Sequence, residues 1–498
     1  MAGKRVVHAL NTPGTNSMNR SLGSRRLAGL LTGTAGDRPG YRALAQGVRT
    51  LLLDGRIPLH TRLPAERELA TALGVSRATV TAAYDLLREG GYARSRRGAG
   101  TWTELPEGQR PASVAAFPTG DDDVIDLAIA APAAPEGELA DALTAAGTML
   151  ARHASTPGYH PYGLPELRAA VAERFTRRGL PTLPEQILIT AGAQQAVSLT
   201  LGLLARAGDR VLVENPSYPN ALDALNRGGM RATPVPVTDG GWDTDLFESA
   251  LRQTAPRLAY LIPDFHNPTG RLMPHEQRVR LLEAARATGT WLVVDETVAD
   301  IALDVPTPAP FASLAPHGAG EQVVTVGSLS KTHWGGLRIG WVRAGSRLIT
   351  ELATARVPVD MAGSVLDQLV ALRLLERMDE VLSERLPRMR AQRDALAEDL
   401  ARELPEWRWQ LPPGGLSLWI DLGRPIASAL ARAALRHGVR VEGGSRFGAD
   451  PGTHEHRLRF PYTQPPEVAR EAVRRLAQTL ADGLGTTGEE PGRPHWVA

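Results

Sequence analysis

Val-Val-Thr-Val-Gly-Ser-Leu-Ser-Lys-Thr, residues 323–332, is an apolar run that ends in two serines and a lysine. Similar short apolar runs precede it and alternate with helical patterns such as residues 274–288. Apolar runs without polar alternation are typical of strands that are buried on both faces of a mainly parallel sheet. The sequence therefore predicts an α/β body with a doubly wound sheet. Its expected strands are residues 187–190, 210–214, 258–262, 291–295 and 322–326.

The lysine in this segment is unusual, because the chain holds only two lysines, Lys4 and Lys331, among 56 basic residues. Arginine matches lysine in charge and hydrogen bonding, but it offers no nucleophilic primary amine. Ligands of doubly wound sheets bind beyond the carboxyl ends of the strands, which is where Lys331 is expected. A surface lysine that survived by chance is the alternative explanation.

The overall composition is that of an ordinary soluble globular protein, with 43% apolar and 22% charged residues in a chain of 498. The absence of cysteine excludes disulfides, thiolate metal sites and a cysteine nucleophile. No stretch approaches the roughly 18 apolar residues that a membrane span needs, and residues 1–19 lack the apolar core of a secretory signal. We therefore expect a cytoplasmic protein without a membrane partner, and we identify no metal-binding residues.

Positive charge is concentrated at one end of the chain. Residues 1–104 hold 16 basic and 7 acidic side chains, whereas the whole chain holds 56 and 54. A basic segment joined to an acidic body suggests a module that binds a polyanion, and a solvated basic surface is the alternative. Residues 41–104 show three helical patterns, the last over 77–89 with Ser76 as its N-cap, and then a basic hairpin. This order predicts a winged helix-turn-helix.

Basic and hydroxyl side chains in this module are placed to contact double-stranded operator DNA. Arg77 and Thr79 lie at the start of the third helix, where a recognition helix meets base edges. Arg67 on the second helix can reach a phosphate or a guanine, and Arg96 and Arg97 in the hairpin can reach phosphates or the minor groove. Proteins that bind no DNA also use helix-turn-helix geometry, so the pattern alone does not establish DNA binding.

The remaining boundaries follow from composition. We expect a flexible arm over residues 1–40, which includes one possible short helix, and a polar linker over 105–123 that is rich in proline, glycine and aspartate. The body spans 124–484, with a large part up to about residue 345 and a small part over about 346–484. Residues 485–498 form a flexible tail.

The polar residues that follow the expected strands match what pyridoxal 5′-phosphate needs. Lys331 supplies the amine for a Schiff base, and Asp295, at the end of its strand, suits the ring nitrogen. Asn267 in the Asn-Pro-Thr-Gly loop suits the phenolic oxygen, and Tyr218 can stack on the ring. Arg459, far downstream, can clamp a substrate carboxylate. The phosphate is expected at the start of a helix and on residues near the lysine, namely Gly192, Ala193, Gln194, Ser328, Ser330 and Arg338.

Each of these signals also has a structural explanation when it is taken singly. Asp295 can cap a helix, Tyr218 can belong to the core, and Asn-Pro-Thr-Gly can be only a turn. Most of the 54 arginines must lie on the surface, which is the alternative for Arg338 and Arg459. The prediction therefore depends on the joint order of the residues along the chain.

Two parts of the chain resemble known families. Leu-Pro-Ala-Glu-Arg-Glu-Leu-Ala at 63–70 and Leu-Gly-Val-Ser-Arg-Ala-Thr-Val at 73–80 resemble the GntR-type DNA-binding domain. The body resembles fold-type I, class I/II aminotransferases in the order of its candidate residues. That order is the phosphate-binding helix start at 192–194, Tyr218, Asn-Pro-Thr-Gly at 267–270, Asp295, and Ser-x-Ser-Lys at 328–331 with an arginine seven residues on. The combination is similar to the MocR subfamily of transcriptional regulators.

The resemblance implies a fold and further contacts. The body should adopt the transferase fold that uses pyridoxal phosphate, with a smaller C-terminal α+β subdomain. The DNA contacts should include Arg67, Arg77 and Thr79. The resemblance also implies a homodimer, in which Tyr159, or alternatively Tyr162, reaches the cofactor phosphate of the partner subunit.

The chain departs from the aminotransferase pattern in two ways. Thr297 and Val298 stand where family members usually carry a tyrosine that hydrogen-bonds the phenolic oxygen, and His266 stands where many relatives carry glutamine. Loss of the phenol should weaken the tuning of proton transfer without abolishing cofactor binding. This favours a sensing role over turnover.

Three functions remain open from the sequence. The preferred one is a transcriptional regulator that binds pyridoxal phosphate, an amino compound or both through Lys331 and thereby changes its affinity for DNA. Such regulation requires a ligand that prefers one arrangement of the domains. The second is a working aminotransferase with an accessory DNA-binding domain, and the third is a cofactor-free regulator that keeps the fold as a dimerising scaffold.

Overall fold

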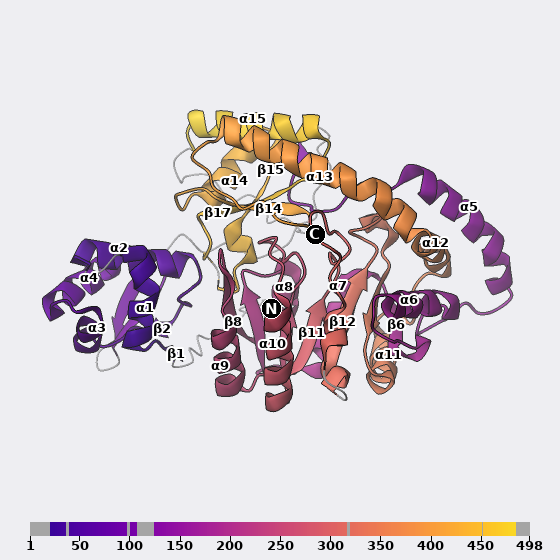
Figure 1. Cartoon of the computed structure of the whole chain (residues 1–498), viewed down its shortest axis with the longest axis horizontal. Coiled ribbons are helices and arrows are strands. Elements are labelled where there is room, and N and C mark those ends of the chain that lie inside the picture. The colour runs from indigo at the N-terminus through magenta and orange to yellow at the C-terminus, as the bar shows by residue number, and fades with distance from the viewer. Residues whose placement is uncertain are drawn as a thin grey trace, which may run out of the picture. The chain divides into compact units, whose positions relative to one another are not determined.

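The computed structural model describes residues 20–35, 39–96, 100–106, 124–315, 319–450 and 452–484. The chain divides into two compact units, Met1–Arg110 and Pro111–Ala498, and each is considered by itself (Figure 1). Residues 1–19 of the expected arm, residues 107–123 of the expected linker and the expected tail over 485–498 lie outside the described residues.

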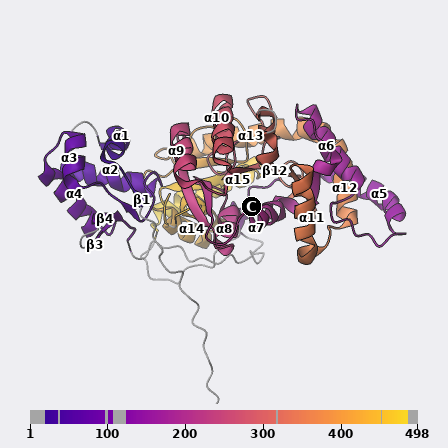
Figure 2. The same cartoon turned by 90° about the horizontal axis from the view of Figure 1, so that it is seen from below.

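The first unit contains the three helices and the hairpin that the sequence predicts (Figure 2). Ser76 caps the third of these helices, because its hydroxyl accepts a hydrogen bond from the Thr79 amide at 3.1 Å. Gly74 ends the preceding helix with φ at 64°, a left-handed conformation that suits glycine. The elements are β1 (Arg20–Ser21), α1 (Ser24–Ala35), α2 (Tyr41–Leu53), β2 (Thr61–Arg62), α3 (Glu66–Leu73), α4 (Arg77–Glu89), β3 (Ala93–Arg96) and β4 (Gly100–Thr103).

The prediction of a flexible arm over residues 1–40 is wrong for its described part, although the possible short helix within it is present as α1. Helix α1 packs against α2 and α3, and its Leu27 and Leu31 are fully buried in the core of the unit. Strand β1 extends the sheet, because it pairs in parallel with β2. The sheet order is β1-β2-β4-β3. Two leucines four residues apart give one apolar helix face, and this outweighs the polar composition around them.

The second unit is built on an eight-stranded sheet of order β6-β13-β12-β11-β10-β7-β8-β9. The strands from β12 to β8 run parallel, and β13 and β9 are antiparallel to their neighbours, so the sheet is mainly parallel as predicted. The strands are β6 (Ile187–Thr190), β7 (Arg210–Asn215), β8 (Arg231–Thr238), β9 (Gly241–Trp242), β10 (Leu258–Leu261), β11 (Trp291–Asp295), β12 (Val323–Ser328) and β13 (Gly340–Arg343).

Helices cover both faces of this sheet, and alternate strand residues point to opposite cores. Leu292 and Val294 of β11 join the core that α6, α9, α10 and α12 cover, whereas Val293 joins the core that α7, α8 and α11 cover. The helices are α5 (Glu136–His153), α6 (Pro165–Arg177), α7 (Gly192–Leu204), α8 (Pro219–Arg227), α9 (Thr244–Thr254), α10 (His275–Thr288), α11 (Ser346–Asp360) and α12 (Val365–Glu376).

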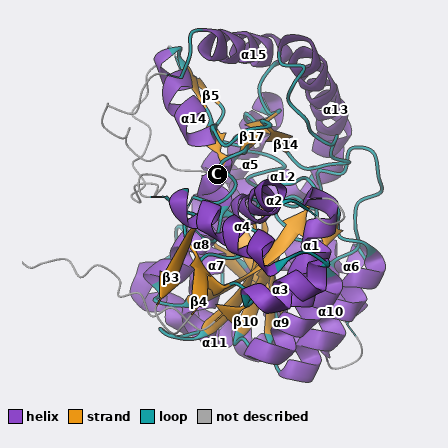
Figure 3. Ribbon diagram, turned by 90° about the vertical axis from the view of Figure 1, so that its left-hand side faces the viewer, coloured by secondary structure: helices purple, strands orange, loops and turns teal. Residues whose placement is uncertain are grey.

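A smaller α+β part completes the second unit. Its helices surround the antiparallel sheet β14-β17-β16 (Figure 3), and β5 (Ile125–Asp126) pairs with β15 on the same core. The expected boundary near residue 345 is wrong, because α11 and α12 bury their apolar residues in the cores of the large sheet. The elements are α13 (Met378–Glu403), β14 (Ser417–Asp421), α14 (Ala427–Arg436), β15 (Val439–Arg440), β16 (Glu442–Gly443), β17 (Arg457–Pro461) and α15 (Pro466–Ala481).

The described ranges lack two types of feature. None of the described helices has the length and apolar character needed to cross a membrane. Among the same residues, no group of three or more histidine or acidic side chains is arranged to hold a metal ion.

Candidate functional site

A cavity of about 1240 Å³ lies at the carboxyl ends of the parallel strands. It brings together most of the residues that the sequence predicts for a cofactor site. The exceptions are Gly192, Arg459 and Tyr159, which do not line it. The predicted residues in its wall are Ala193, Gln194, Tyr218, Asn267, Asp295, Ser328, Ser330, Lys331 and Arg338.

Lys331 follows β12 and extends into this cavity. Its Nζ donates a hydrogen bond to the carbonyl oxygen of Ala130 at 2.9 Å. Burial lowers the pKa of the Lys331 amine to about 7, and the positive charges of Arg459 and Arg338 act in the same direction, while Asp295 opposes them. A substantial fraction of the amine is therefore neutral and nucleophilic near neutral pH.

Asp295 ends β11 and is held by two donors. The Tyr260 hydroxyl donates to Oδ2 at 2.7 Å, and the Thr297 amide donates to Oδ1 at 3.0 Å. Tyr260 lies on the adjacent strand β10 and is fully buried, and this burial raises its pKa well above the usual value, so its hydroxyl stays a donor. The sequence did not single out Tyr260, because it stands inside an ordinary apolar strand.

A buried acid, Glu214, helps to hold the loop that carries Asn267. Glu214 of β7 accepts hydrogen bonds from the Trp242 indole at 2.6 Å and from the Ile262 amide at 2.7 Å. His266 links this acid to the loop, because its Nε2 lies 3.3 Å from Glu214 Oε2 and its Nδ1 lies 3.0 Å from Thr269 Oγ1. The sequence did not single out Glu214 either, because the residues that contact it are distant from it in the sequence.

The start of α7 forms a cradle for an anion. The first amides of a helix have no partner within the helix and carry the positive end of its dipole. Arg338 closes the cradle by donating from Nη2 to the Ala191 carbonyl oxygen at 2.9 Å. Gly192 has φ at 76°, a conformation that side-chain-bearing residues rarely adopt, and a Cβ on it would lie 2.7 Å from that guanidinium nitrogen, so this position favours glycine. Ser328 and Ser330 hydrogen-bond each other at 2.9 Å beside Lys331.

Tyr218 places its ring in the wall of the cavity. Its hydroxyl accepts a hydrogen bond from Asn220 Nδ2 at 2.8 Å. Burial raises the pKa of Tyr218 to about 12, so the phenol stays neutral under ordinary conditions. A neutral aromatic face in this position can stack on a planar ring.

Arg459 of β17 is fully buried and does not line the cavity. Its guanidinium donates to the carbonyl oxygen of Ala128 and lies 5.0 Å from the ring centroid of Phe447. Burial lowers the pKa of Arg459 to about 10, which still leaves it charged. The segment over residues 127–135, which we call the strap, therefore covers the arginine that the sequence assigns to a carboxylate.

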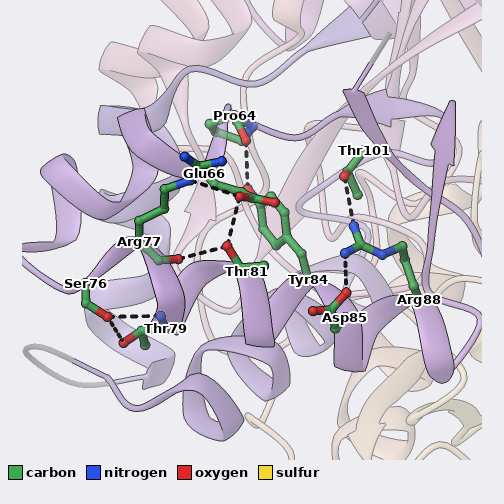
Figure 4. Close-up of polar contacts among 10 residues, drawn as sticks. All are labelled: Pro64, Glu66, Ser76, Arg77, Thr79, Thr81, Tyr84, Asp85, Arg88 and Thr101. Carbon is green, nitrogen blue, oxygen red and sulfur yellow. Dashed lines mark hydrogen bonds and ion pairs between the residues drawn. The ribbon is translucent and has the colours of Figure 1, made fainter. Parts of the chain in front are cut away.

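The helix-turn-helix of the first unit is held by side-chain bonds around Glu66 (Figure 4). Glu66 Oε2 accepts from Arg77 Nε at 3.3 Å and from the Thr81 hydroxyl at 2.8 Å. The Arg77 side chain remains 72% exposed, so it is available to a partner. Thr79 bonds the Ser76 hydroxyl at 2.8 Å. Arg67 is exposed on α3, whereas Arg97 and the side chain of Arg96 lie outside the described residues.

Residues 122–476 match the family model described as aminotransferase class I and II. The chain belongs to this aminotransferase family. A solved structure of the α-aminoadipate aminotransferase LysN from Thermus thermophilus superposes on it with a TM-score of 0.66 at 33% identity, and the match covers 73% of this chain and 93% of LysN. The predicted fold of the body is thereby confirmed.

The chain carries a second family match ahead of its aminotransferase domain. Residues 40–102 match the model of bacterial regulatory proteins of the gntR family. The HTH-type transcriptional regulator YisV of Bacillus subtilis is 28% identical over 88% of this chain and 97% of its own length. The regulatory protein MocR of Rhizobium meliloti is 33% identical over 61% of this chain and 65% of its own length. These matches confirm the predicted MocR-type architecture, a GntR domain fused to an aminotransferase domain.

The structure shows what stands in place of the usual tyrosine of aminotransferases. Thr297 and Val298 both line the cavity, and neither offers a phenol. The two tyrosines that the family resemblance offers for a contact with a partner subunit differ in exposure. Tyr159 is 64% exposed, whereas Tyr162 is partly buried with the Arg168 guanidinium 5.3 Å from its ring centroid.

Proposed function

We propose that this protein is a transcriptional regulator whose aminotransferase domain binds pyridoxal phosphate, and then an amino compound, at Lys331. The observation that carries the proposal is the position of Lys331. The second of only two lysines in the chain extends into a large cavity beside Asp295 and Asn267, in the same chain as a GntR domain. We also propose that the protein is cytoplasmic, because a transcriptional regulator has to reach DNA.

The residues of the cavity fit the cofactor. When bound, pyridoxal phosphate supplies an aldehyde that condenses with primary amines and a protonated ring that withdraws electrons. Lys331 would provide the amine, and Asp295, held by Tyr260 and Thr297, would keep the ring nitrogen protonated. The amides at the start of α7 and Arg338 would hold the phosphate. Ser328, Ser330 and Gln194 complete that end of the site.

The remaining contacts belong to the ligand and to a second subunit. Arg459 would bind the carboxylate of the amino compound. We propose a homodimer in which Tyr159, which is exposed and absent from its own cavity, reaches the phosphate in the partner subunit. The packing of Tyr162 against Arg168 supports Tyr159 over Tyr162 for this role.

The direct test of the regulatory proposal is selection of genomic fragments bound by the full-length protein, with and without pyridoxal phosphate. Specific fragments whose enrichment changes with the cofactor are the expected result, since a regulating ligand must bind the two DNA-affinity states unequally. Enrichment that is identical in both conditions would contradict sensing by the cofactor.

Arg77→Ala should weaken binding to a selected fragment by about 1–3 kcal/mol if Arg77 reads a guanine. The exposed guanidinium at the start of the recognition helix is the reason for this expectation. Binding is measured by fluorescence anisotropy on the selected fragment and on random DNA. Arg25→Ala, which removes the same charge from an exposed position on α1, is the control. An equal loss on both DNAs would make Arg77 a phosphate contact.

The rate at which pyridoxal phosphate adds to the protein should follow the protonation of Lys331. Because the pKa of the amine is about 7, the neutral form is lost below that pH, and the rate should fall about tenfold per pH unit there. The rate should level off above about pH 8, whereas an ordinary lysine would go on gaining up to about pH 10. Stopped-flow absorbance of the cofactor gives the profile. A rate that still climbs between about pH 8 and 10 would contradict the lowered pKa.

A working aminotransferase is the second candidate function. It is favoured by the 33% identity to LysN over most of that enzyme and by the presence of Lys331, Asp295 and Arg459. The test mixes pure protein with amino acids and a keto acid. Steady turnover above that of Lys331→Ala would establish this function, and its absence with the amino acids tested would favour the regulatory proposal.

A further inference from the structure

The strap, residues 127–135, runs through the cofactor site and supplies part of its wall. Residues 129–135 line the cavity. Its N-terminal end is continuous with β5, where the Ile125 and Leu127 amides donate to the Gly438 and Arg440 carbonyl oxygens at 2.9 and 2.8 Å. Through β5 the strap follows directly on the segment that joins the body to the GntR domain in the sequence.

Three cations from three different elements hold the strap by its backbone carbonyl oxygens. Arg459 donates to Ala128, Lys331 donates to Ala130 at 2.9 Å, and Arg385 donates to Ala133 at 3.0 Å. Among the described residues, no backbone–backbone hydrogen bond involves an amide between Ile129 and Pro135. Hydrogen bonds from charged donors are stronger than neutral ones, so these contacts add to the burial of Leu127 and Ala130 in holding the strap.

Two of these three cations are the groups that the proposed ligands would take. Attachment of the cofactor aldehyde to Lys331 expels one water and turns the primary amine into an imine nitrogen. That nitrogen no longer has a hydrogen to spare for Ala130. A ligand carboxylate on Arg459 would compete with the Ala128 carbonyl oxygen, because a carboxylate is the stronger acceptor for a guanidinium.

We propose that the strap is an internal occupant of the site, with its Lys331 anchor released by the attached cofactor and its Arg459 anchor released by a ligand carboxylate. This inference rests on the proposed function and adds the way in which occupancy is sensed. It also specifies the ligand class. The amine of an α-amino acid takes the cofactor from Lys331 and so returns the Lys331 amine to Ala130, while its carboxylate frees the Arg459 anchor. A simple amine also returns the Lys331 amine but leaves the Arg459 anchor in place.

The chain offers a clean probe, because it contains no cysteine. Ala131→Cys places a single thiol in the middle of the strap, at a half-buried position. Ala287→Cys, on the exposed face of α10 and away from the cavity, is the matched control. The alkylation rate of each thiol is measured in the full-length protein, alone and with saturating ligand.

Two stable reduced adducts make the test independent of turnover. One joins phosphopyridoxyl to L-leucine, and the other joins it to 3-methylbutylamine, so the two differ only in the carboxylate and shield the thiol equally. Both leave the Lys331 amine free. The leucine adduct should raise the alkylation rate of Ala131→Cys about tenfold over the amine adduct, as expected for loss of one charged hydrogen bond. Pyridoxal phosphate alone should raise the rate by a similar factor, through Lys331. Ala287→Cys should change with neither.

Arg385 supplies an independent check that needs no ligand. Arg385→Gln removes the third anchor and should raise the ligand-free rate of Ala131→Cys. Arg388→Gln, three residues further along α13 and also in the cavity wall, removes the same charge and should leave that rate unchanged. Hydrogen exchange of the peptide over 127–136 in the otherwise unmodified chain repeats the adduct comparison without cysteine.

The outcomes separate this inference from the proposed function. Equal alkylation rates of Ala131→Cys with the two adducts, together with cofactor attached at Lys331, would contradict the proposed release of the strap and leave the proposed function standing. A protein that attaches no cofactor at Lys331 would overturn both.

Discussion

Lys331→Ala is expected to abolish covalent attachment of pyridoxal phosphate to this protein. Borohydride converts a lysine–cofactor linkage into a stable amine, so the unaltered chain should gain the mass of one reduced cofactor on the peptide that contains residue 331. The variant should gain none, because among the described residues Lys331 alone brings an amine to the cavity, next to the acid and the anion cradle. Peptide mass spectrometry after reduction gives the occupancy of each site.

The chain provides its own control for this experiment. Lys4→Arg removes the other lysine and should leave attachment unchanged. The charge at residue 331 can be restored by Lys331→Arg, which should also attach no cofactor, since a guanidinium is not a nucleophilic amine. An adduct on any other residue of Lys331→Ala, or full occupancy at Lys4 in the unaltered chain, would remove the basis of the proposed function.

Gly340→Ala is expected to displace the backbone at the start of α7, which forms the anion cradle. A Cβ on Gly340 would lie 2.6 Å from the carbonyl carbon of Gly192, 2.7 Å from the Ala193 nitrogen and 2.8 Å from the Gly327 oxygen. All three are backbone atoms, so no side chain can move aside to admit the methyl group. Overpacking of this kind costs about 1–3 kcal/mol of the free energy of unfolding.

The larger effect should fall on cofactor binding, because the loop that moves carries the phosphate donors. A displacement of about 1 Å in such a positioning element can cost on the order of 10²-fold. Gly345→Ala, in the connection from β13 to α11, has no atom within 4 Å of its added Cβ and is the matched control. Denaturant titration and cofactor titration are measured on both variants. Equal affinity for the cofactor in the two variants would show that the cradle does not hold the phosphate.

Those parts of the fold with unbroken local patterns could be predicted from the sequence. The strands over 187–190 and 291–295 and the helix over 77–89 have the predicted bounds, because apolar runs and an N-cap serine are local signals. Local sequence does not show whether a helix packs on the large or on the small part of the body. The sequence places residues 346–360 in the small part, but only the folded structure shows that they form α11 and cover the large sheet.

The candidate site shows the same division. Residues that stand at strand ends with unusual chemistry, such as Lys331 and Asp295, could be chosen from the sequence. Tyr260 and Glu214 could not, since each lies inside a strand and acts through neighbours that are 35 and 48 residues away in sequence. The strap was missed because a run of alanine and proline carries no side-chain chemistry, and its contacts use backbone oxygens.

The burial of Leu27 and Leu31 of α1 affects how the DNA-reading half can be isolated. The gntR family match begins at residue 40, and a fragment cut there would strip away a helix and an edge strand that complete the apolar centre. Such a fragment would expose apolar residues of α2 and α3 that α1 contacts, and would invite aggregation. A soluble piece for crystallisation with an operator should therefore start ahead of residue 20.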